Sequence, residues 1–136
     1  MDAAQGNPRI LFVDDDPEIR AIYRRMARVA GLHVDVAANG IEAIGFARHR
    51  AYAVVVTDWT MPSGGGEKLI DQLSRAQPQA VPLVVTGVRP APVVTDAAGT
   101  PIEVINKPWS QRELLDAIRR AVARAGAAAA TAAVGR

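Results

Sequence analysis

Five short apolar runs recur along the chain, and segments long enough to form helices separate them. The runs are rich in β-branched residues, and three of them lack polar alternation, which is typical of strands buried on both faces of a parallel sheet. They occupy residues 10–13, 34–37, 53–57, 82–85 and 102–105. The repeated order of strand then helix predicts a doubly wound α/β domain with helices on both faces of one parallel sheet.

Helix start or stop signals flank three of the segments that follow these runs. Asp16 precedes a proline, and Asn39 and Ser110 each begin a capping box that a glutamate completes three residues later. Gly31 and Gly126 lie where helices are expected to stop. The predicted helices cover residues 17–30, 40–50, 65–77 and 110–125.

The fourth crossover differs from the others, because its sequence VRPAPVVTDAAGTP contains three prolines and a β-branched run. A helix there is expected to be short or irregular, with at most about two turns from Pro92 to Gly99. The predicted organisation is a disordered N-terminal arm at residues 1–8, one folded domain at 9–125, and an alanine-rich flexible tail at 126–136.

Length and composition narrow the class of protein. A chain of 136 residues fits one domain, and the absence of cysteine excludes disulfides, thiolate metal sites and cysteine nucleophiles. No stretch approaches the ~20 apolar residues of a membrane span, so we expect a cytoplasmic protein with no membrane partner. Aromatic residues make up only 4% of the chain and the net charge is +2, so direct nucleic-acid binding is a minor alternative.

Polar residues follow the carboxyl ends of four predicted strands, where sheets of this kind form their ligand crevice. These residues are, in chain order, Asp14, Asp15, Asp16, Asp58, Thr86 and Lys107. Taken singly, each has an ordinary structural explanation, such as a helix cap for Asp16. Taken together, three converging carboxylates repel one another unless a cation neutralises them, and oxygen ligands without His or Cys favour Mg²⁺ or Mn²⁺.

A carboxylate beside such a cation is able to attack phosphorus and form an acyl phosphate, while the cation and a lysine spread the charge of the transferring oxygens. Asp58 stands alone at the end of the central predicted strand. Asp58 is therefore the candidate nucleophile.

Four motifs that occur in order along the chain carry a family resemblance: ILFVDDDP, VVVTDWTMPSGGG, VPLVVTG and INKPW. Together they resemble the response-regulator receiver domains of two-component signalling, over residues 9–124. The resemblance implies a flavodoxin-like sheet with strand order 2-1-3-4-5. It also implies a cis peptide bond between Lys107 and Pro108, and Met61, Pro62 and Gly66 match the family's turn after the acceptor.

The resemblance also implies a role for each residue of the site. Asp58 is the phosphoacceptor, Asp15 a direct Mg²⁺ ligand, and Asp14 acts mainly through water. The Thr60 carbonyl completes the metal site, while Thr86 and Lys107 each bind a phosphoryl oxygen. Mn²⁺ is expected to substitute for Mg²⁺.

One departure from the family concerns the surface through which the domain is expected to signal. Many receivers have a tyrosine or phenylalanine three residues before the lysine, where this chain has Val104. The expected switch region comprises Gly87, Val88 and Val104, and residues 88–101 are the element that a phosphoryl group is expected to move.

The resemblance implies a phosphoacceptor that receives its phosphoryl group from a histidine kinase or a histidine phosphotransfer protein. No second domain is expected after Arg124, so the chain is expected to signal by binding an unknown downstream protein rather than to act as an enzyme. One alternative is a pseudo-receiver, an interaction module that never takes phosphate; the intact set of site residues argues against it. Another is a phosphatase or phosphotransferase, for which the chain lacks a cap or substrate loops.

Overall fold

The computed structural model describes residues 8–61 and 65–134, with side-chain surroundings up to residue 127. Of the predicted N-terminal arm only Pro8 lies within these ranges, and Pro62 of the predicted turn lies outside them. Within the described ranges, no helix combines the length and the apolar character needed to cross a membrane.

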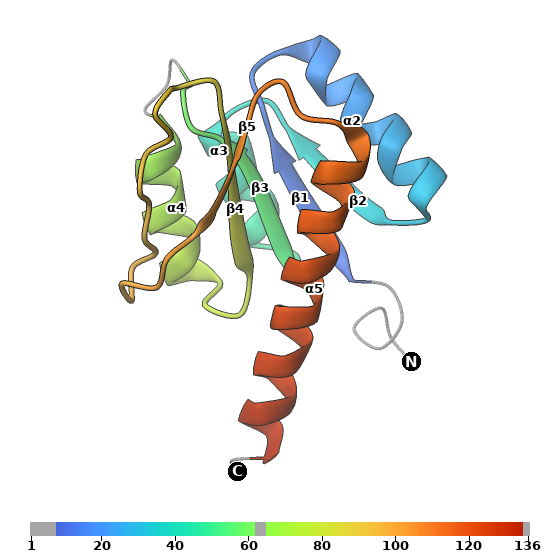
Figure 1. Ribbon diagram of the computed structural model, residues 1–136. Coiled ribbons are helices and arrows are strands. Elements are labelled where there is room, and N and C mark those ends of the chain that lie inside the picture. The colour runs from blue at the N-terminus through green and yellow to red at the C-terminus, as the bar shows by residue number, and fades with distance from the viewer. Residues whose placement is uncertain (1–7, 62–64, 135–136) are drawn as a thin grey trace.

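Five strands form one parallel sheet in the order β2-β1-β3-β4-β5, as predicted (Figure 1). The strands are β1 (Arg9–Val13), β2 (His33–Ala37), β3 (Val54–Asp58), β4 (Val81–Thr86) and β5 (Glu103–Asn106). The central strand β3 is buried along its whole length. Burial on both faces explains why its apolar run shows no polar alternation.

Two helices cover each face of the sheet (Figure 1). The helices are α2 (Pro17–Ala30), α3 (Gly40–Ala47), α4 (Gly65–Ala76) and α5 (Gln111–Val134). On one face, Phe12 of β1 packs with Tyr23 of α2 and Leu114 of α5. On the other face, Leu11 of β1 packs with Leu69 of α4. Alternate residues of one strand therefore supply the two halves of the core.

Local capping contacts start the helices where the sequence predicts. The Asp16 carboxylate accepts a hydrogen bond from the Glu18 amide at 2.9 Å, and the Asn39 side chain accepts one from the Glu42 amide at 2.8 Å. Gly31 ends α2 with φ 71°, a left-handed conformation that glycine adopts without strain. These contacts fix the loops that follow β1 and β2 at the carboxyl edge of the sheet.

The predicted end of the last helix is wrong. Helix α5 continues through Gly126 to Val134, beyond the predicted end at residue 125. One glycine within a helix costs about 1 kcal/mol relative to alanine, and the alanines on either side have the highest helix propensity of any residue. Gly126 therefore does not terminate the helix. The expected fraying of residues 126–136 stays a prediction.

The connection between β4 and β5, residues 87–102, is called the strap below. No helix lies in it, so the short helix expected between Pro92 and Gly99 is absent, while the expected irregularity is confirmed. Counted along the chain, the fourth helix is α5, which is long and follows β5. Gly99, with φ 85°, forms part of a turn in which the Asp96 carboxylate accepts two amide hydrogen bonds. The prolines and this turn explain the missing helix.

Candidate functional site

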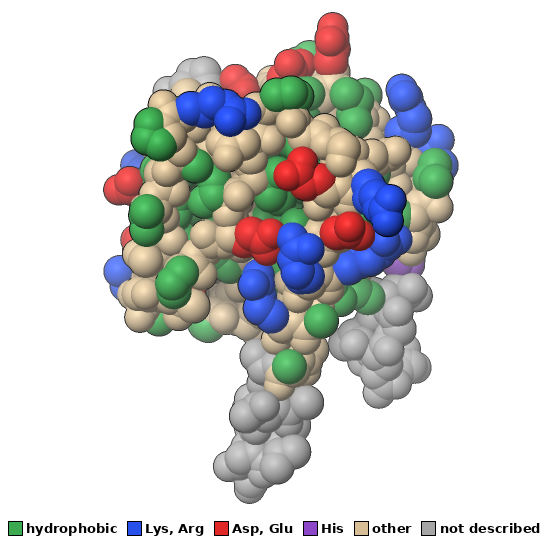
Figure 2. Space-filling view, in the orientation of Figure 1, with side chains coloured by type: hydrophobic (Ala, Val, Ile, Leu, Met, Phe, Trp, Pro, Cys, Tyr) green, Lys and Arg blue, Asp and Glu red, His purple; other side chains and the backbone are tan. Residues whose placement is uncertain are grey.

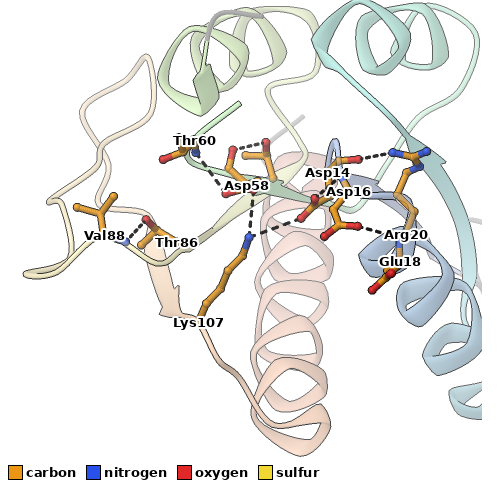
Figure 3. A network of polar contacts seen from close by, with 10 residues as sticks. Asp14, Asp16, Glu18, Arg20, Asp58, Thr60, Thr86, Val88 and Lys107 are labelled. Atoms are coloured by element: carbon orange, nitrogen blue, oxygen red, sulfur yellow. Dashed lines mark hydrogen bonds and ion pairs between the residues drawn. The ribbon is translucent and has the colours of Figure 1, made fainter. Parts of the chain in front are cut away.

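Four strands bring the predicted site residues to one edge of the sheet (Figure 3). Asp14 directly follows β1, Asp58 and Thr86 are the last residues of β3 and β4, and Lys107 directly follows β5. Because all the strands are parallel, their carboxyl ends meet at the same edge. The convergence predicted from the sequence is therefore present.

Both oxygens of the Asp58 carboxylate have a partner. The Lys107 ammonium lies 3.1 Å from Oδ2, and the Thr60 amide donates to Oδ1 at 3.2 Å. Asp58 is 7% exposed, whereas about a third of the Lys107 side chain, 32%, is exposed. The carboxylate is thus mostly buried beside a partly exposed cation, which a ligand is able to approach from solvent.

Asp14 is the most deeply buried carboxylate of the site, with 1% of its surface exposed. Its Oδ1 accepts a hydrogen bond from the Asp16 amide at 2.9 Å, but its Oδ2 has no hydrogen-bond partner among the described atoms. The nearest cation to Oδ2 is the Lys107 ammonium at 3.8 Å. Burial raises the pKa of Asp14 above its ordinary value, and repulsion from Asp58 also raises this pKa, against the lowering effect of the Asp16 amide.

Three carboxylates at this edge are placed to share a cation. Asp14, Asp15 and Asp58 each offer one oxygen, and these oxygens lie within 4.8 Å of one another. The all-oxygen donor set suits Mg²⁺ or Mn²⁺, and the unpartnered Oδ2 of Asp14 is a buried acceptor that a cation would satisfy. Asp16 is not in this group, because its carboxylate caps α2 as expected. The Thr60 carbonyl stays a predicted ligand.

Thr86 is fully buried at the end of β4, and its hydroxyl oxygen accepts a hydrogen bond from the Val88 amide at 2.9 Å. A hydroxyl that accepts through its oxygen still has one hydrogen to donate. Thr86 is therefore able to bind a phosphoryl oxygen without losing its contact with the strap. Gly87 and Val88 are exposed, and Val104 is partly buried against the cluster formed by Ile70, Val84, Val94 and Ile102.

The turn after Asp58 requires a glycine at position 66. The Gly66 amide donates to the Trp59 carbonyl at 2.8 Å, and a Cβ on Gly66 would lie 2.7 Å from the Asp58 carbonyl oxygen. That separation is too short for a side chain of any size. Met61, in the same turn, is buried, and the Lys107–Pro108 peptide bond is cis, as predicted.

Two arginines that the sequence patterns did not identify contact residues of the site. The Arg20 guanidinium donates to the Asp14 carbonyl at 3.0 Å, and the Arg89 guanidinium donates to the Lys107 carbonyl at 3.0 Å. Both guanidinium groups donate to backbone carbonyls. Because nearly every residue offers a backbone carbonyl, the types of residue in the sequence do not reveal such contacts. Arg20 lies in α2 together with Arg24, Arg25 and Arg28, so only the folded chain distinguishes its role from theirs.

The fold and the site together define a class: parallel α/β domains that carry a group of carboxylates and a lysine at the strand ends. Residues 10–119 match the family model of the response regulator receiver domain. The chain belongs to this family, whose members act in two-component signalling.

Relatives with known names agree with this assignment. The chain is 32% identical over 132 residues to the transcriptional regulatory protein PrrA of Mycobacterium leprae, covering 95% of this chain and 56% of that protein. It is 33% identical over 113 residues to a response regulator receiver protein of Anaeromyxobacter, covering 79% of this chain and 46% of that protein. The chain thus spans about half the length of these relatives.

Solved structures agree on the fold. A CheY-like receiver domain protein from Methanospirillum hungatei superposes with a TM-score of 0.77 at 23% identity, over 89% of this chain and 98% of that one. At this identity the likeness concerns the fold alone.

Proposed function

We propose that the chain takes a phosphoryl group onto Asp58 from a histidine kinase or a histidine phosphotransfer protein, and signals through changed binding to a downstream protein. The proposed cation is Mg²⁺, held by Asp14, Asp15, Asp58 and the Thr60 carbonyl. The observation that carries the proposal is the position of the Asp58 carboxylate, 3.1 Å from the Lys107 ammonium and within the group of three carboxylates.

In the proposed reaction an Asp58 oxygen forms a bond to phosphorus while the bond between phosphorus and the donor's imidazole nitrogen breaks. The electron pair of the broken bond goes to the imidazole, and the product is an acyl phosphate on Asp58. A bound Mg²⁺ supplies positive charge against the phosphoryl oxygens. Lys107 moves its ammonium from Asp58 to a phosphoryl oxygen, and the Thr86 hydroxyl donates to another.

The experiment is labelling with acetyl phosphate in Mg²⁺, followed by borohydride trapping and mass spectrometry. Wild type should carry the modification at Asp58 alone, and Asp58→Asn or removal of Mg²⁺ with EDTA should abolish it. Asp16→Asn is the matched control, because Asp16 lies outside the carboxylate group and asparagine also caps helices well. Modification at Asp14 or Asp16 would overturn the assignment, and an unlabelled wild type would favour the pseudo-receiver.

The surface charge supports protein partners in preference to nucleic acid. Acidic and basic side chains lie interspersed over the face that carries α5 (Figure 2). Arg119 pairs with Asp116 at 3.7 Å and Arg120 with Glu103 at 2.5 Å, so part of the arginine charge on α5 is neutralised within the chain. Nucleic-acid binding depends on cations that are free to contact phosphates. Since the phosphoryl group in this proposal ends on the chain's own Asp58, the proposed role is a switch and not an enzyme.

A further inference from the structure

Three hydrogen bonds join the end of β4 to the end of β5, directly behind the two residues proposed to bind phosphoryl oxygens. The Lys107 amide donates to the Thr86 carbonyl at 2.8 Å, and the Asn106 side chain donates to the Val88 carbonyl at 3.4 Å. The Arg89 guanidinium donates to the Lys107 carbonyl at 3.0 Å. The Lys107 amide is therefore bound to the end of β4, and the Lys107 carbonyl is bound to the strap.

Arg89 has no partner of opposite charge in the part of the chain that the structure describes. Its described polar contact is the hydrogen bond to the Lys107 carbonyl, across 18 residues of sequence. An arginine side chain loses conformational entropy when it is held in one geometry. A guanidinium that binds a single carbonyl in this way restricts the position of that carbonyl. The constraint falls on the peptide group that joins Lys107 to Pro108.

The position of this peptide group matters because the Lys107 side chain carries the ammonium that lies beside both carboxylates. Its ammonium reaches Asp58 at 3.1 Å and Asp14 at 3.8 Å, while about a third of the side chain stays exposed (Figure 3). A flexible, partly solvated stem gives the ammonium many alternative positions. A fixed backbone at Lys107 therefore reduces the number of positions that the ammonium can take and favours those beside Asp58.

The chain just after Lys107 is held from the other side. Trp109 stacks on Tyr23 with ring centroids 5.8 Å apart, and Tyr23 stacks on Phe12 at 4.3 Å. This stack fixes the ring of Trp109 against α2 and β1. The Lys107 carbonyl lies between this stack and the Lys107 amide, which donates to the Thr86 carbonyl. Arg89 is the described side chain that binds this Lys107 carbonyl.

We propose that Arg89 is a positioning residue for phosphoryl transfer, which acts by holding the Lys107 backbone so that the ammonium stays at Asp58 and meets the incoming phosphoryl oxygens. The inference rests on the proposed phosphorylation of Asp58. Arg89 then couples the position of the strap to the position of Lys107. It lies at the start of the segment that is expected to change conformation.

The test measures the rate constant of Asp58 phosphorylation by acetyl phosphate in Mg²⁺. Arg89→Ala should lower it by about 3- to 10-fold, the range that one exposed hydrogen bond from a charged donor supports. Arg89→Lys keeps a cationic donor and should recover part of the loss. Arg124→Ala, which removes an exposed arginine with no described ion pair, should leave the rate constant unchanged.

A double-mutant cycle separates positioning from a purely structural role. In a Lys107→Ala background the carbonyl that Arg89 binds is still present but the ammonium is gone, so Arg89→Ala should cause no further loss of rate. A structural role would lower the rate by the same factor in both backgrounds, and that result would overturn the inference. Equal rates for wild type and Arg89→Ala, with label on Asp58, would overturn the inference and leave the proposed function standing. A wild type that takes no label would overturn both.

Discussion

Asp14 is the residue on which the electrostatic balance of the site depends most. It is almost completely buried, one of its oxygens has no described hydrogen-bond partner, and its pKa is raised chiefly by burial. An aspartate whose pKa is raised by folding favours the folded state most when it is protonated. At neutral pH and without a cation, its charge therefore lowers the stability of the fold.

Asp14→Asn should stabilise the cation-free protein at pH 7, by about 1 kcal/mol, because a neutral amide replaces a buried charge of similar shape. Below about pH 4, near the ordinary pKa of aspartate, the wild-type carboxyl is also protonated and the advantage should vanish. The advantage should grow as the pH rises through the raised pKa. Urea unfolding in EDTA over a pH series measures this difference.

The control for this prediction is Asp16→Asn, which changes an exposed helix cap and should shift the unfolding free energy little at any pH. If Asp14 takes part in the cation site, excess Mg²⁺ should make wild type more stable to unfolding than Asp14→Asn, the reverse of the order in EDTA. An Asp14→Asn protein less stable than wild type at pH 7 in EDTA would contradict this account of the buried charge.

Among the secondary-structure elements, the start of α4 is packed most tightly against the acceptor. Gly66→Ala would place a Cβ 2.7 Å from the Asp58 carbonyl oxygen and 2.9 Å from the Trp59 Cα, so backbone must move. We expect a loss of about 1 to 3 kcal/mol in the free energy of unfolding. Slower phosphorylation of Asp58 should accompany it, since the displaced atoms belong to the acceptor residue. Thermal unfolding and the labelling rate measure the two effects.

Gly45→Ala is a matched control for Gly66→Ala, because Gly45 lies within α3 and a Cβ there meets nothing within 4 Å. Alanine should stabilise this helix by about 0.5 to 1 kcal/mol, since it has the higher helix propensity. A Gly66→Ala protein as stable as Gly45→Ala would show that the turn after Asp58 adapts at little cost.

The strap is the element with the weakest attachment to the core. Val94 and Ile102 are its buried anchors, whereas Val88 is 45% and Val93 is 95% exposed. Segments with few buried apolar contacts open at low free energy, which a switch requires. Its first residues are joined to Thr86 and Lys107 by hydrogen bonds. A phosphoryl group that engages those two residues is therefore expected to act on the strap first.

Beryllofluoride, which stands in for the phosphoryl group, should change amide hydrogen exchange most between Val88 and Ile105. Mass spectrometry of peptides with and without beryllofluoride in Mg²⁺ measures this change. Asp58→Asn should show no response. If the strap already exchanges slowly in the free protein and beryllofluoride leaves it unchanged, the conformational switch lies elsewhere, although the assignment of Asp58 would stand.

For the molecule as a whole, α5 extends well past the sheet that its first half covers (Figure 1). Its buried residues are Leu114, Ala117, Ile118, Ala121 and Ala125. Gly126 and Ala127 are exposed, so the contribution of α5 to the core ends at Ala125 among the residues whose side chains are described.

A chain that ends at Ala127 should keep its unfolding free energy within about 0.5 kcal/mol of the full chain, because it retains every described core residue of α5. Asp58 labelling should be equally fast in both chains. Thermal unfolding measured on the two chains side by side tests the first statement. A truncation after Ile118 would remove Ala121 and Ala125 from the core and serves as the destabilised comparison.

Sequence patterns were sufficient to predict the strands, their parallel pairing with helices on both faces, and the polar residues that meet at the strand ends. Burial on both faces of a parallel sheet imposes continuous apolar runs, which are visible in the chain. Helix starts depend on contacts within three or four residues, so Asp16, Asn39 and Ser110 were sufficient to place them. Since parallel strands end at one edge, their order along the chain was enough to bring Asp58 and Lys107 together.

Tertiary structure alone decided the features that depend on atoms distant in sequence or on a balance of small propensities. Whether α5 stops at Gly126 depends on the cost of about 1 kcal/mol for a glycine within a helix, set against the high helix propensity of the neighbouring alanines. A single stop signal in the sequence does not decide that balance. The hydrogen bonds of Arg20 and Arg89 end on backbone carbonyls 6 and 18 residues away, and the identity of a residue carries no information about such partners. The unpartnered oxygen of Asp14 likewise exists only because the folded chain buries it.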